Sequence, residues 1–279
     1  MIAIIDGDVL CYMSCYNSWE SILTEIGRWT DEQKIYTLNE DGDKVLVLTP
    51  EQERKYLEKS WNTFQIKLQD LLDSVYCTEY LMAVKGSNNY RNLLYSDYKM
   101  NRHVKPDKQN MFVPLLRKLA VAQGMAVPSD GCEADDLMRI WAMQAKEAGD
   151  DYIICTVDKD LKCIEGKHYL MHIGKKEEDR LITIDHDEAL KHYYQQLLKG
   201  DPTDNIPGVP RIGNKKAESL LKNCITEHEM QEVVVGAYIE FYDDAWKDYF
   251  LSNAKMIHLQ RYHGDYFKAS EWPILVELL

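Results

Sequence analysis

Acidic side chains recur at four places where a strand or a turn is expected to end. They are Asp6 in MIAIIDGD, Glu133, Asp135 and Asp136 in CEADD, Asp158 and Asp160 in TVDKD, and Asp201 and Asp204 in GDPTD. Taken singly, each place could be a turn, an N-cap or a first helical turn whose acids complement the helix dipole. Carboxylates that gather together repel one another unless cations neutralise them, and oxygen donors suit Mg²⁺ or Mn²⁺. Because paired ions commonly promote attack of water on a phosphodiester, the pattern predicts metal-dependent phosphodiester hydrolysis.

A Gly/Pro-rich segment follows the last acidic pair. GVPRIG at 208–213 lies between two expected short helices, and Lys215 and Lys216 follow it. Glycines allow a tight turn, and the N–H groups at a helix N-terminus bind phosphate. The pattern is typical of a helix–hairpin–helix, which holds a nucleic-acid backbone without reading its sequence. A Walker A loop is excluded because Asn214 follows Gly213, which leaves a plain turn between core helices as the other interpretation.

The charge of the chain is unevenly distributed. Its 279 residues include 33 Lys or Arg and 46 Asp or Glu, giving a formal net charge of -13. This balance opposes nucleic-acid binding, yet binding depends on local patches. Eight basic residues between Lys85 and Lys118 are accompanied only by Asp97 and Asp107, and residues 211–222 form a second basic patch. A nucleic acid therefore remains a candidate partner.

Composition places the chain in a broad class. With 45% hydrophobic and 28% charged residues it resembles an ordinary globular protein, and it has no apolar stretch long enough to span a bilayer. The start, MIAIIDGDVLCYM, is expected to be a strand, with no secretory signal. Seven cysteines without a CxxC pair favour reduced, buried thiols over disulfides or a zinc site. We therefore expect a cytoplasmic protein that does not contact membranes.

The elements that must position these residues alternate between strands and helices. Strands are expected at 1–5, 79–84, 152–157, 169–174 and 180–184, and helices at 50–75, 112–124, 132–149 and through most of 186–279. This alternation predicts an α/β fold with a mostly parallel central sheet flanked by helices, whose functional groups gather at the carboxyl ends of the strands. The long polar segment 85–110 is expected to be functional.

These motifs resemble those of the 5′-nuclease family, which includes phage 5′→3′ exonucleases, flap endonucleases and the 5′-nuclease domain of bacterial DNA polymerase I. The shared motifs, in the family's order, are IIDGD, YSDYKMNR at 95–102, GCEADDL at 131–137, TVDKDL at 156–161 and GDPTDNIPGVPRIGNKKA at 200–217. The resemblance implies a PIN/5′-nuclease-like core at 1–190 with a helical arch at about 86–120. It also implies a helical region at 191–279 that carries the helix–hairpin–helix at about 195–222.

The resemblance also implies a role for each motif residue. One metal ion would be held by Asp6, Glu133, Asp135 and Asp136, and a second by Asp158, Asp160, Asp201 and Asp204. Lys99 and Arg102 would contact the scissile phosphate. The DNA-binding residues would be Tyr98, stacking on a terminal base, with Lys105 and Lys108 in the arch and Gly208, Val209, Gly213, Lys215 and Lys216 in the hairpin. The implied cofactors are two Mg²⁺ or Mn²⁺ ions, with K⁺ on the hairpin carbonyls.

The implied activity is that of a 5′→3′ exonuclease, extending to flap endonuclease cleavage, with 5′-phosphate products. Its substrates would be duplex or branched DNA with a free 5′ end and RNA–DNA hybrid, in the host-cell cytoplasm if the chain is phage-encoded. One departure is that the family places a further metal-binding Asp at the end of the strand before the arch, where this chain has Lys85 and Gly86. Either the first metal site lacks a ligand, or the chain is inactivated, or Asp97 replaces the missing acid. Two alternatives stay open: a branched-DNA binder without catalysis, and an RNA-directed PIN-type ribonuclease.

Overall fold

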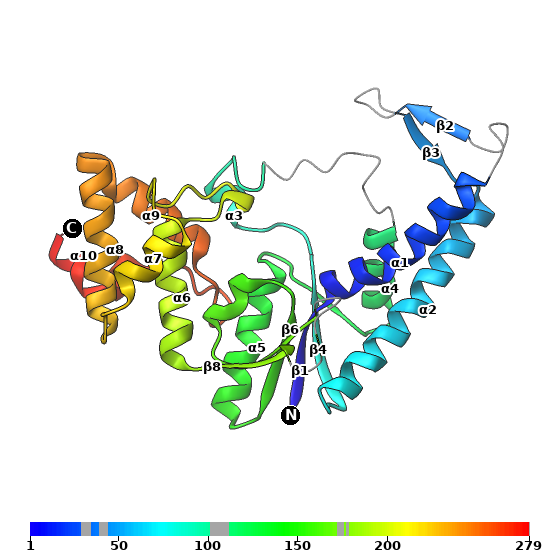
Figure 1. Ribbon diagram of the computed structural model, residues 1–279, viewed down its shortest axis with the longest axis horizontal. Coiled ribbons are helices and arrows are strands. Elements are labelled where there is room, and N and C mark those ends of the chain that lie inside the picture. Colours follow the sequence, from blue (N-terminus) through cyan, green and yellow to red (C-terminus); the bar gives the residue numbers. More distant parts are fainter. Residues whose placement is uncertain (29–34, 39–43, 101–111, 172–175, 177–178, 279) are drawn as a thin grey trace.

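A six-stranded sheet runs through the middle of the computed structural model (Figure 1), which describes residues 1–28, 35–38, 44–100, 112–171, 176 and 179–278. In sheet order its strands are β5 (Val127–Pro128), β4 (Glu79–Val84), β1 (Ile2–Asp6), β6 (Tyr152–Thr156), β7 (Gly166–Leu170) and β8 (Leu181–Ile184). Neighbouring strands are parallel except for β7 and β8, which are antiparallel. The prediction of a mostly parallel α/β sheet is confirmed.

The central strand explains why the acids meet. Ala3, Ile4 and Ile5 of β1 are fully buried, as expected for a strand that is covered by helices on both faces. β1 pairs in parallel with both β4 and β6, and Asp6 lies opposite Ala83. The carboxyl ends of these three strands therefore lie at the same edge of the sheet.

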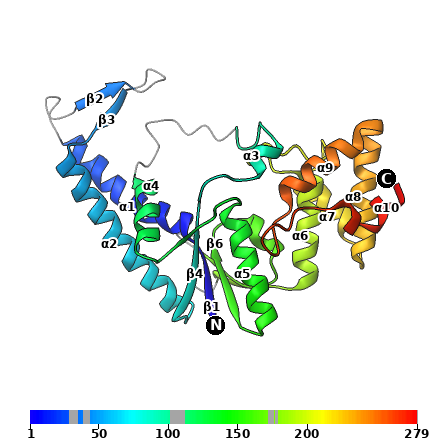
Figure 2. The ribbon, with the colours of Figure 1, turned by 180° about the vertical axis from the view of Figure 1, so that it is seen from behind.

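Helices cover the two faces of the sheet. On one face α1 (Gly7–Gly27), α2 (Pro50–Ser74) and α4 (Phe112–Ala122) share a hydrophobic core with β1, and on the other α5 (Ala134–Ala148) packs on β1 and β4. The long helix α2 begins as predicted, with Pro50 at its first position and a capping box between Thr49 and Gln52. Figures 1 and 2 show α1 and α2 extending away from the sheet as an arm, with β2 (Ile35–Leu38) and β3 (Lys44–Val47) at its far end.

The C-terminal helices pack around a second hydrophobic core, on the opposite side of the sheet from that arm (Figure 2). They are α6 (His186–Lys199), α7 (Asn214–Leu221), α8 (Glu227–Tyr242), α9 (Trp246–Ile257) and α10 (Pro273–Leu278). Their shared core includes the buried side chains of Tyr194, Val234, Tyr238 and Phe250. The prediction of helix from 186 onward is confirmed for most of this region, but residues 258–268 have no helix.

The segment that was expected to form an arch begins and ends on different sides of the molecule. The short helix α3 (Arg91–Leu94) contacts α9, whereas α4 packs against α1 and α2. Residues 101–111, between them, lie outside the described residues, and so do Arg102, Lys105 and Lys108. The arch at 86–120 therefore stays a prediction.

Smaller differences and confirmations concern single elements. β7 begins at Gly166, three residues before the expected strand, because Gly166 and Lys167 pair with neighbouring strands without belonging to an apolar run. All seven cysteines are buried, as predicted. None of the described helices has the length and apolar character needed to cross a membrane.

Candidate active site

The first acids of the site lie at the ends of β1 and β6. Asp6 is buried, and its Oδ2 accepts a hydrogen bond from the Thr156 hydroxyl at 3.0 Å, while its Oδ1 accepts one from the Val9 N–H at 3.1 Å. Burial raises the pKa of Asp6 to about 6, and the nearby charges of Asp8 and Asp158 add to the shift. The sheet pairing therefore brings the acids of the first and the fourth motif together.

The start of α5 adds further acids at this edge. Asp135 is half-buried, and its pKa is raised well above the usual range by burial and by the charges of Asp6, Asp158 and Glu133. A buried carboxylate whose neighbours are carboxylates favours the protonated form, unless a cation joins the group. The acids of α5 and those of β1 and β6 thus form one electrostatically coupled cluster.

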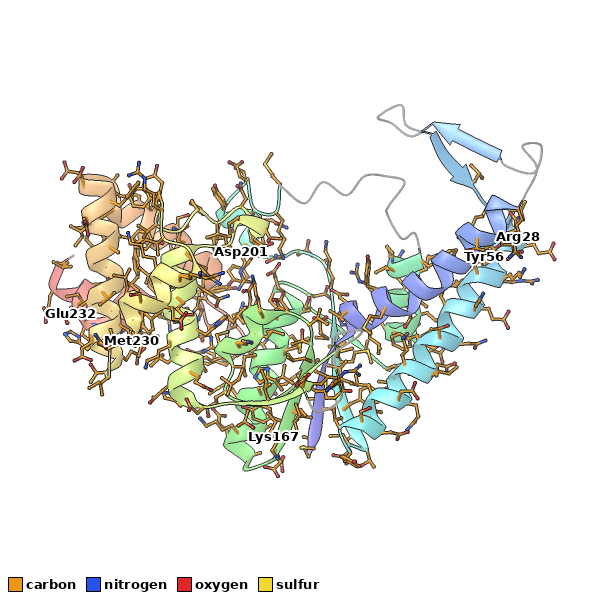
Figure 3. All side chains as sticks on the ribbon, viewed as in Figure 1. Arg28, Tyr56, Lys167, Asp201, Met230 and Glu232 are labelled. Atoms are coloured by element: carbon orange, nitrogen blue, oxygen red, sulfur yellow. The ribbon has the colours of Figure 1, made fainter. Side chains whose placement is uncertain are left out.

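Asp160 links this cluster to the last acidic motif. The short 3₁₀ helix η3 (Lys159–Cys163) is capped by Asp158, whose Oδ1 accepts the Asp160 N–H at 2.8 Å. The pKa of Asp160 is raised to about 6 by burial and by the charges of Asp158 and Asp201, with Lys199 opposing the shift. Figure 3 labels Asp201 beside the C-terminal helices, above the core. We call Asp6, Asp135 and Asp160 the repelled carboxylates.

Lys99 and Tyr98 join Glu133 to Asp204. The Lys99 Nζ forms an ion pair with Glu133 and lies 3.6 Å from Asp204 Oδ2, while the Tyr98 hydroxyl donates to Glu133 Oε2 at 2.8 Å and reaches Asp204 Oδ2 at 3.2 Å. Lys99 has φ 59°, and its N–H donates to the Asp204 carbonyl at 3.1 Å. Burial raises the pKa of Glu133, but the charges of Arg91 and Lys99 outweigh it and lower that pKa below the usual value.

The position of Tyr98 corrects one prediction. Its side chain is only 6% exposed and belongs to the core of the C-terminal helices. A ring in this position has no free face on which a terminal base could stack. Tyr98 instead positions two carboxylates through its hydroxyl, which burial and those carboxylates keep protonated by raising its pKa.

Asp136 has a different environment from its neighbour Asp135. It is fully buried, and its two oxygens accept hydrogen bonds from Arg91 Nη1 at 2.5 Å and Nη2 at 2.9 Å. The backbone N–H groups of Glu133 and Gln260 add bonds at 2.9 and 3.0 Å. Burial raises the pKa of Asp136, but the charge and hydrogen bonds of Arg91 outweigh this effect, and the pKa lies below its usual value. Because both oxygens are engaged in this way, the metal-ligand role expected of Asp136 does not fit its surroundings.

Sequence reasoning missed Arg91, which it counted as part of a basic patch. Its side chain is 1% exposed, and no local pattern in RNLL marks it as buried. Lys99 and Arg117 of the same stretch are also ion-paired, to Glu133 and to Asp8. Carboxylates that are distant in the sequence thus neutralise part of the positive charge of this stretch.

The end of β4, where the family's additional acid is missing, is occupied by a carboxylate from α1. The Lys85 N–H lies 3.1 Å from both oxygens of Asp8, and Arg117 Nε donates to Asp8 Oδ1 at 2.5 Å. Asp97 is exposed and accepts a hydrogen bond from the Ser96 hydroxyl. The carboxylate that faces this strand end is therefore that of Asp8, whereas Asp97 lies elsewhere.

The segment that joins α6 to α7 contains the last acids and a tight turn. Gly200 and Gly208 have φ 65° and 61°, and a Cβ on Gly208 would lie 2.2 Å from the Gly200 nitrogen. Backbone hydrogen bonds pair Asp201 with Ile206 at 2.8 and 2.9 Å. Of the two glycines expected to allow the turn, Gly208 has a left-handed φ that favours glycine, whereas Gly213 has φ -95°, which any residue can adopt.

The predicted phosphate-binding residues divide into two groups around this turn. Gly208 and Val209 are buried, with the Gly208 carbonyl accepting the Tyr242 hydroxyl at 2.8 Å. Lys215 and Lys216 are exposed in the first turn of α7, which Gly213 caps. Accessible positive charge in the hairpin therefore comes from Arg211, which is exposed in the turn, and from the two lysines.

The donor set can be compared with the needs of a divalent ion. Within the described part of the chain, no three His, Cys, Asp or Glu side chains converge closely enough to hold a metal ion as they stand. The donors are carboxylates, which Mg²⁺ and Mn²⁺ accept, and the repelled carboxylates lack a cation that balances them. The cluster therefore fits such an ion in donor type and charge, with side-chain rotation needed to bring three donors together.

Known nucleases resemble this chain in sequence. The family described as "5′-3′ exonuclease, N-terminal resolvase-like domain" matches residues 57–196. The 5′-3′ exonuclease of Buchnera aphidicola subsp. Schizaphis graminum is 30% identical over 165 residues, which cover 56% of each chain. The DNA polymerase I of Chloroflexus aurantiacus is 33% identical over 156 residues, which cover 50% of this chain and 16% of that one. The chain thus spans about half of the first relative and less than a fifth of the polymerase.

Solved structures share the fold across nearly the whole chain. A T5 protein co-crystallised with metal ions matches with a TM-score of 0.64 and 15% identity, over 99% of this chain and 96% of that one. A bacteriophage T5 flap endonuclease in a pseudo-enzyme–product complex with DNA and metal ions matches with a TM-score of 0.52 and 13% identity, over 92% and 98% of the two chains. At these identities the similarity concerns the fold.

Proposed function

Because the chain belongs to the family of 5′-3′ exonucleases with an N-terminal resolvase-like domain, we propose that it is a divalent-metal-dependent 5′→3′ exonuclease. The substrate would be DNA with a free 5′ end, or RNA–DNA hybrid, and the products would carry 5′-phosphates. The observation that carries this proposal is that the parallel pairing of β1 with β6 and the start of α5 bring Asp6, Asp158 and Asp135 to one edge of the sheet, where burial and like charges raise the pKa of Asp6 and Asp135. Flap cleavage is the second candidate, because the T5 flap endonuclease shares the fold.

The proposed metal ligands follow the two acidic groups of the cluster. Asp6, Glu133 and Asp135 would hold one Mg²⁺ or Mn²⁺ ion, and Asp158, Asp160, Asp201 and Asp204 would hold a second. When bound, such ions lower the pKa of water and stabilise the charge of the leaving oxygen. Asp136 is left out of this set because Arg91 and two backbone N–H groups already occupy its oxygens.

Lys99 is the residue of this chain that we assign to the scissile phosphate. Its ammonium group is paired with Glu133 and lies near Asp204, so it stands between the two proposed ligand groups. A phosphate that approaches the ions would compete for this ammonium, which would then stabilise developing negative charge on the phosphate oxygens. The contacts expected of Arg102 with the scissile phosphate, and of Lys105 and Lys108 with the DNA in the arch, stay predictions.

The hairpin supplies the proposed grip on the duplex. Lys215 and Lys216 are exposed beside the N-terminus of α7, where backbone N–H groups also attract phosphate. Because Asp201 pairs with Ile206 inside the same turn, the proposed metal ligand Asp201 and the DNA-binding lysines of the hairpin would be held at a fixed separation. K⁺ on the hairpin carbonyls stays a prediction, since the Gly208 carbonyl accepts one hydrogen bond and keeps a second lone pair.

Substitution of Asp158 tests the proposed activity. Asp158→Asn should abolish Mg²⁺-dependent shortening of 5′-labelled duplex, and asparagine should keep the cap of η3 because it is also a good N-cap residue. Asp187→Asn is the matched control, since Asp187 is exposed in the first turn of α6. Unchanged cleavage by Asp158→Asn would contradict the metal mechanism. Branched-DNA binding without any cleavage by the wild type would favour the non-catalytic alternative, and preference for single-stranded RNA would favour the ribonuclease.

A further inference from the structure

The segment 256–271, which we call the strap, begins in the last turn of α9 and passes close to the acids that open α5. It contains one short 3₁₀ helix, η7 (Ala269–Glu271). Its backbone carbonyls at Met256 and His258 accept hydrogen bonds from Arg91 Nε at 2.8 Å and from Arg91 Nη2 at 2.7 Å. The N–H of Gln260 donates to Asp136 Oδ1 at 3.0 Å. The strap thus contacts both members of the buried Arg91–Asp136 pair.

Arg91 connects three distant parts of the chain. It belongs to α3, pairs with Asp136 on α5 and donates to the strap, and its Nη1 lies 3.6 Å from Glu133 Oε2. The planar guanidinium fork fixes the directions of all these bonds at once, which an ammonium group could not do. The side chain is therefore held in one geometry, and so is the carboxylate that it faces.

The strap is itself anchored by a second buried carboxylate. Asp265 is fully buried and accepts hydrogen bonds from the N–H, Nε and Nη2 of Arg261 at 3.0, 2.7 and 3.1 Å. His258 Nε2 lies 3.3 Å from the same carboxylate, and Arg139 on α5 donates to the Leu259 carbonyl at 2.8 Å. The carbonyls that hold Arg91 therefore belong to a backbone that is fixed on both sides.

We propose that Arg91 and the strap are positioning elements of the metal centre. They hold Asp136, whose Oδ2 accepts the N–H of Glu133 at 2.9 Å, and so fix the first turn of α5, which carries Glu133 and Asp135. This inference rests on the proposed function. The matched family region ends at residue 196, so a segment well outside it completes the site.

Arg91 variants test the inference through catalysis and metal binding. Arg91→Met should lower kcat by about tenfold to a hundredfold, the usual effect of removing a group that orients metal ligands. Mn²⁺ affinity, measured by calorimetry without DNA, should fall in parallel, whereas KM and DNA affinity in Ca²⁺ should stay within about twofold because no DNA-binding residue changes. Arg91→Lys should remain impaired, since it keeps the charge but cannot bind Asp136 and the carbonyls together.

A strap variant and a stability control separate positioning from folding. Asp265→Asn loosens the strap without touching α5, so kcat and Mn²⁺ affinity should fall in the same direction but less than in Arg91→Met. Tyr238→Phe removes buried hydrogen bonds to Leu197 and Asn253 in the helical core, and both quantities should stay at wild-type values despite a lower Tm.

Two results would overturn the inference. One is wild-type kcat and Mn²⁺ affinity in Arg91→Met. The other is an equal loss of both in Tyr238→Phe at the same reduction in Tm, which would show that a general loss of stability is the cause. A wild-type chain that cleaves no DNA would contradict the proposed function alone, and the Mn²⁺ titrations would still decide the role of the strap.

Discussion

Two sets of carboxylates lie at the same edge of the sheet and differ in what balances their charge. Glu133, Asp136 and Asp204, which we call the paired carboxylates, contact Arg91, Lys99 or the Tyr98 hydroxyl. The pKa of each repelled carboxylate is raised by burial and by neighbouring carboxylates, and the charges of Lys99 near Asp135 and of Lys199 near Asp160 oppose the shift only in part. The first set is neutralised in large part within the chain, whereas the second set has no cation in the chain that balances it.

This difference sets the sign of each carboxylate's effect on stability. A paired, buried carboxylate stabilises the fold, because removing it leaves its cation uncompensated. A repelled carboxylate destabilises the metal-free fold, because burial and like charges both oppose its ionised form. Adjacent residues of one helix, Asp135 and Asp136, belong to opposite sets and therefore offer the sharpest test.

The largest effect is expected for Asp135→Asn. Loss of a proposed ligand should reduce Mg²⁺-dependent cleavage by about a thousandfold or more, since metal stabilisation of the transition state is worth several kcal/mol. The metal-free variant should nevertheless be more stable than the wild type, because the amide removes a repelled charge at nearly constant shape. Single-turnover rates and urea unfolding in EDTA measure the two effects. A less stable metal-free variant would place Asp135 among the paired carboxylates.

The next effect is expected for Asp136→Asn, with the opposite sign on stability. Removing one partner of the buried ion pair should lower the free energy of unfolding by about 3–5 kcal/mol, because the Arg91 guanidinium is left without its counter-charge. Urea unfolding in EDTA provides the measurement, with exposed Asp187→Asn as a control that should stay within about 0.5 kcal/mol of the wild type. Equal stability of the two variants would remove the distinction between the paired and the repelled set.

Local patterns were sufficient to predict much of the fold. The Thr49–Pro50 start of α2, the Gly149 end of α5 and the apolar run of β6 are signals within a few residues, and all three elements form as expected. The parallel sheet then brings Asp6 and Asp158 to one edge, because strand order and direction leave few other arrangements. The sequence was therefore sufficient to predict that acids directly after parallel strands lie close together.

The partners of those acids were not predictable in the same way. Arg91, Asp136 and Gln260 meet through tertiary packing, and no spacing in the sequence records that contact. The resemblance implied that Tyr98 stacks on a terminal base, yet its side chain packs into the C-terminal core. Charge counts treated Arg91, Lys99 and Arg117 as a surface patch, whereas ion pairing across the fold assigns each of them to a carboxylate. Distinguishing paired from repelled acids therefore required the three-dimensional structure.

The pH dependence of stability gives the smallest and most selective test. The pKa of Asp6 is about 6 in the folded protein and 3.8 ordinarily, so the folded state binds more protons between these values. Stability contributed by Asp6 must then fall as the pH rises through this window, by about 3 kcal/mol without metal. For Glu133 the folded pKa is lowered from 4.5, so its contribution is present above that pH and is lost as the pH falls.

Urea unfolding of the wild type, Asp6→Asn and Glu133→Gln between pH 4 and 7 separates these contributions. Subtracting the free energy of unfolding of each variant from that of the wild type removes groups common to both, including His192, whose pKa burial lowers to about 4. The Asp6 difference should decrease with rising pH, and the Glu133 difference should increase. Saturating Mg²⁺ should flatten the Asp6 difference, because the ion takes the place of the proton. If both differences changed with pH in the same direction, the paired and the repelled carboxylates would not differ in how their charge is balanced.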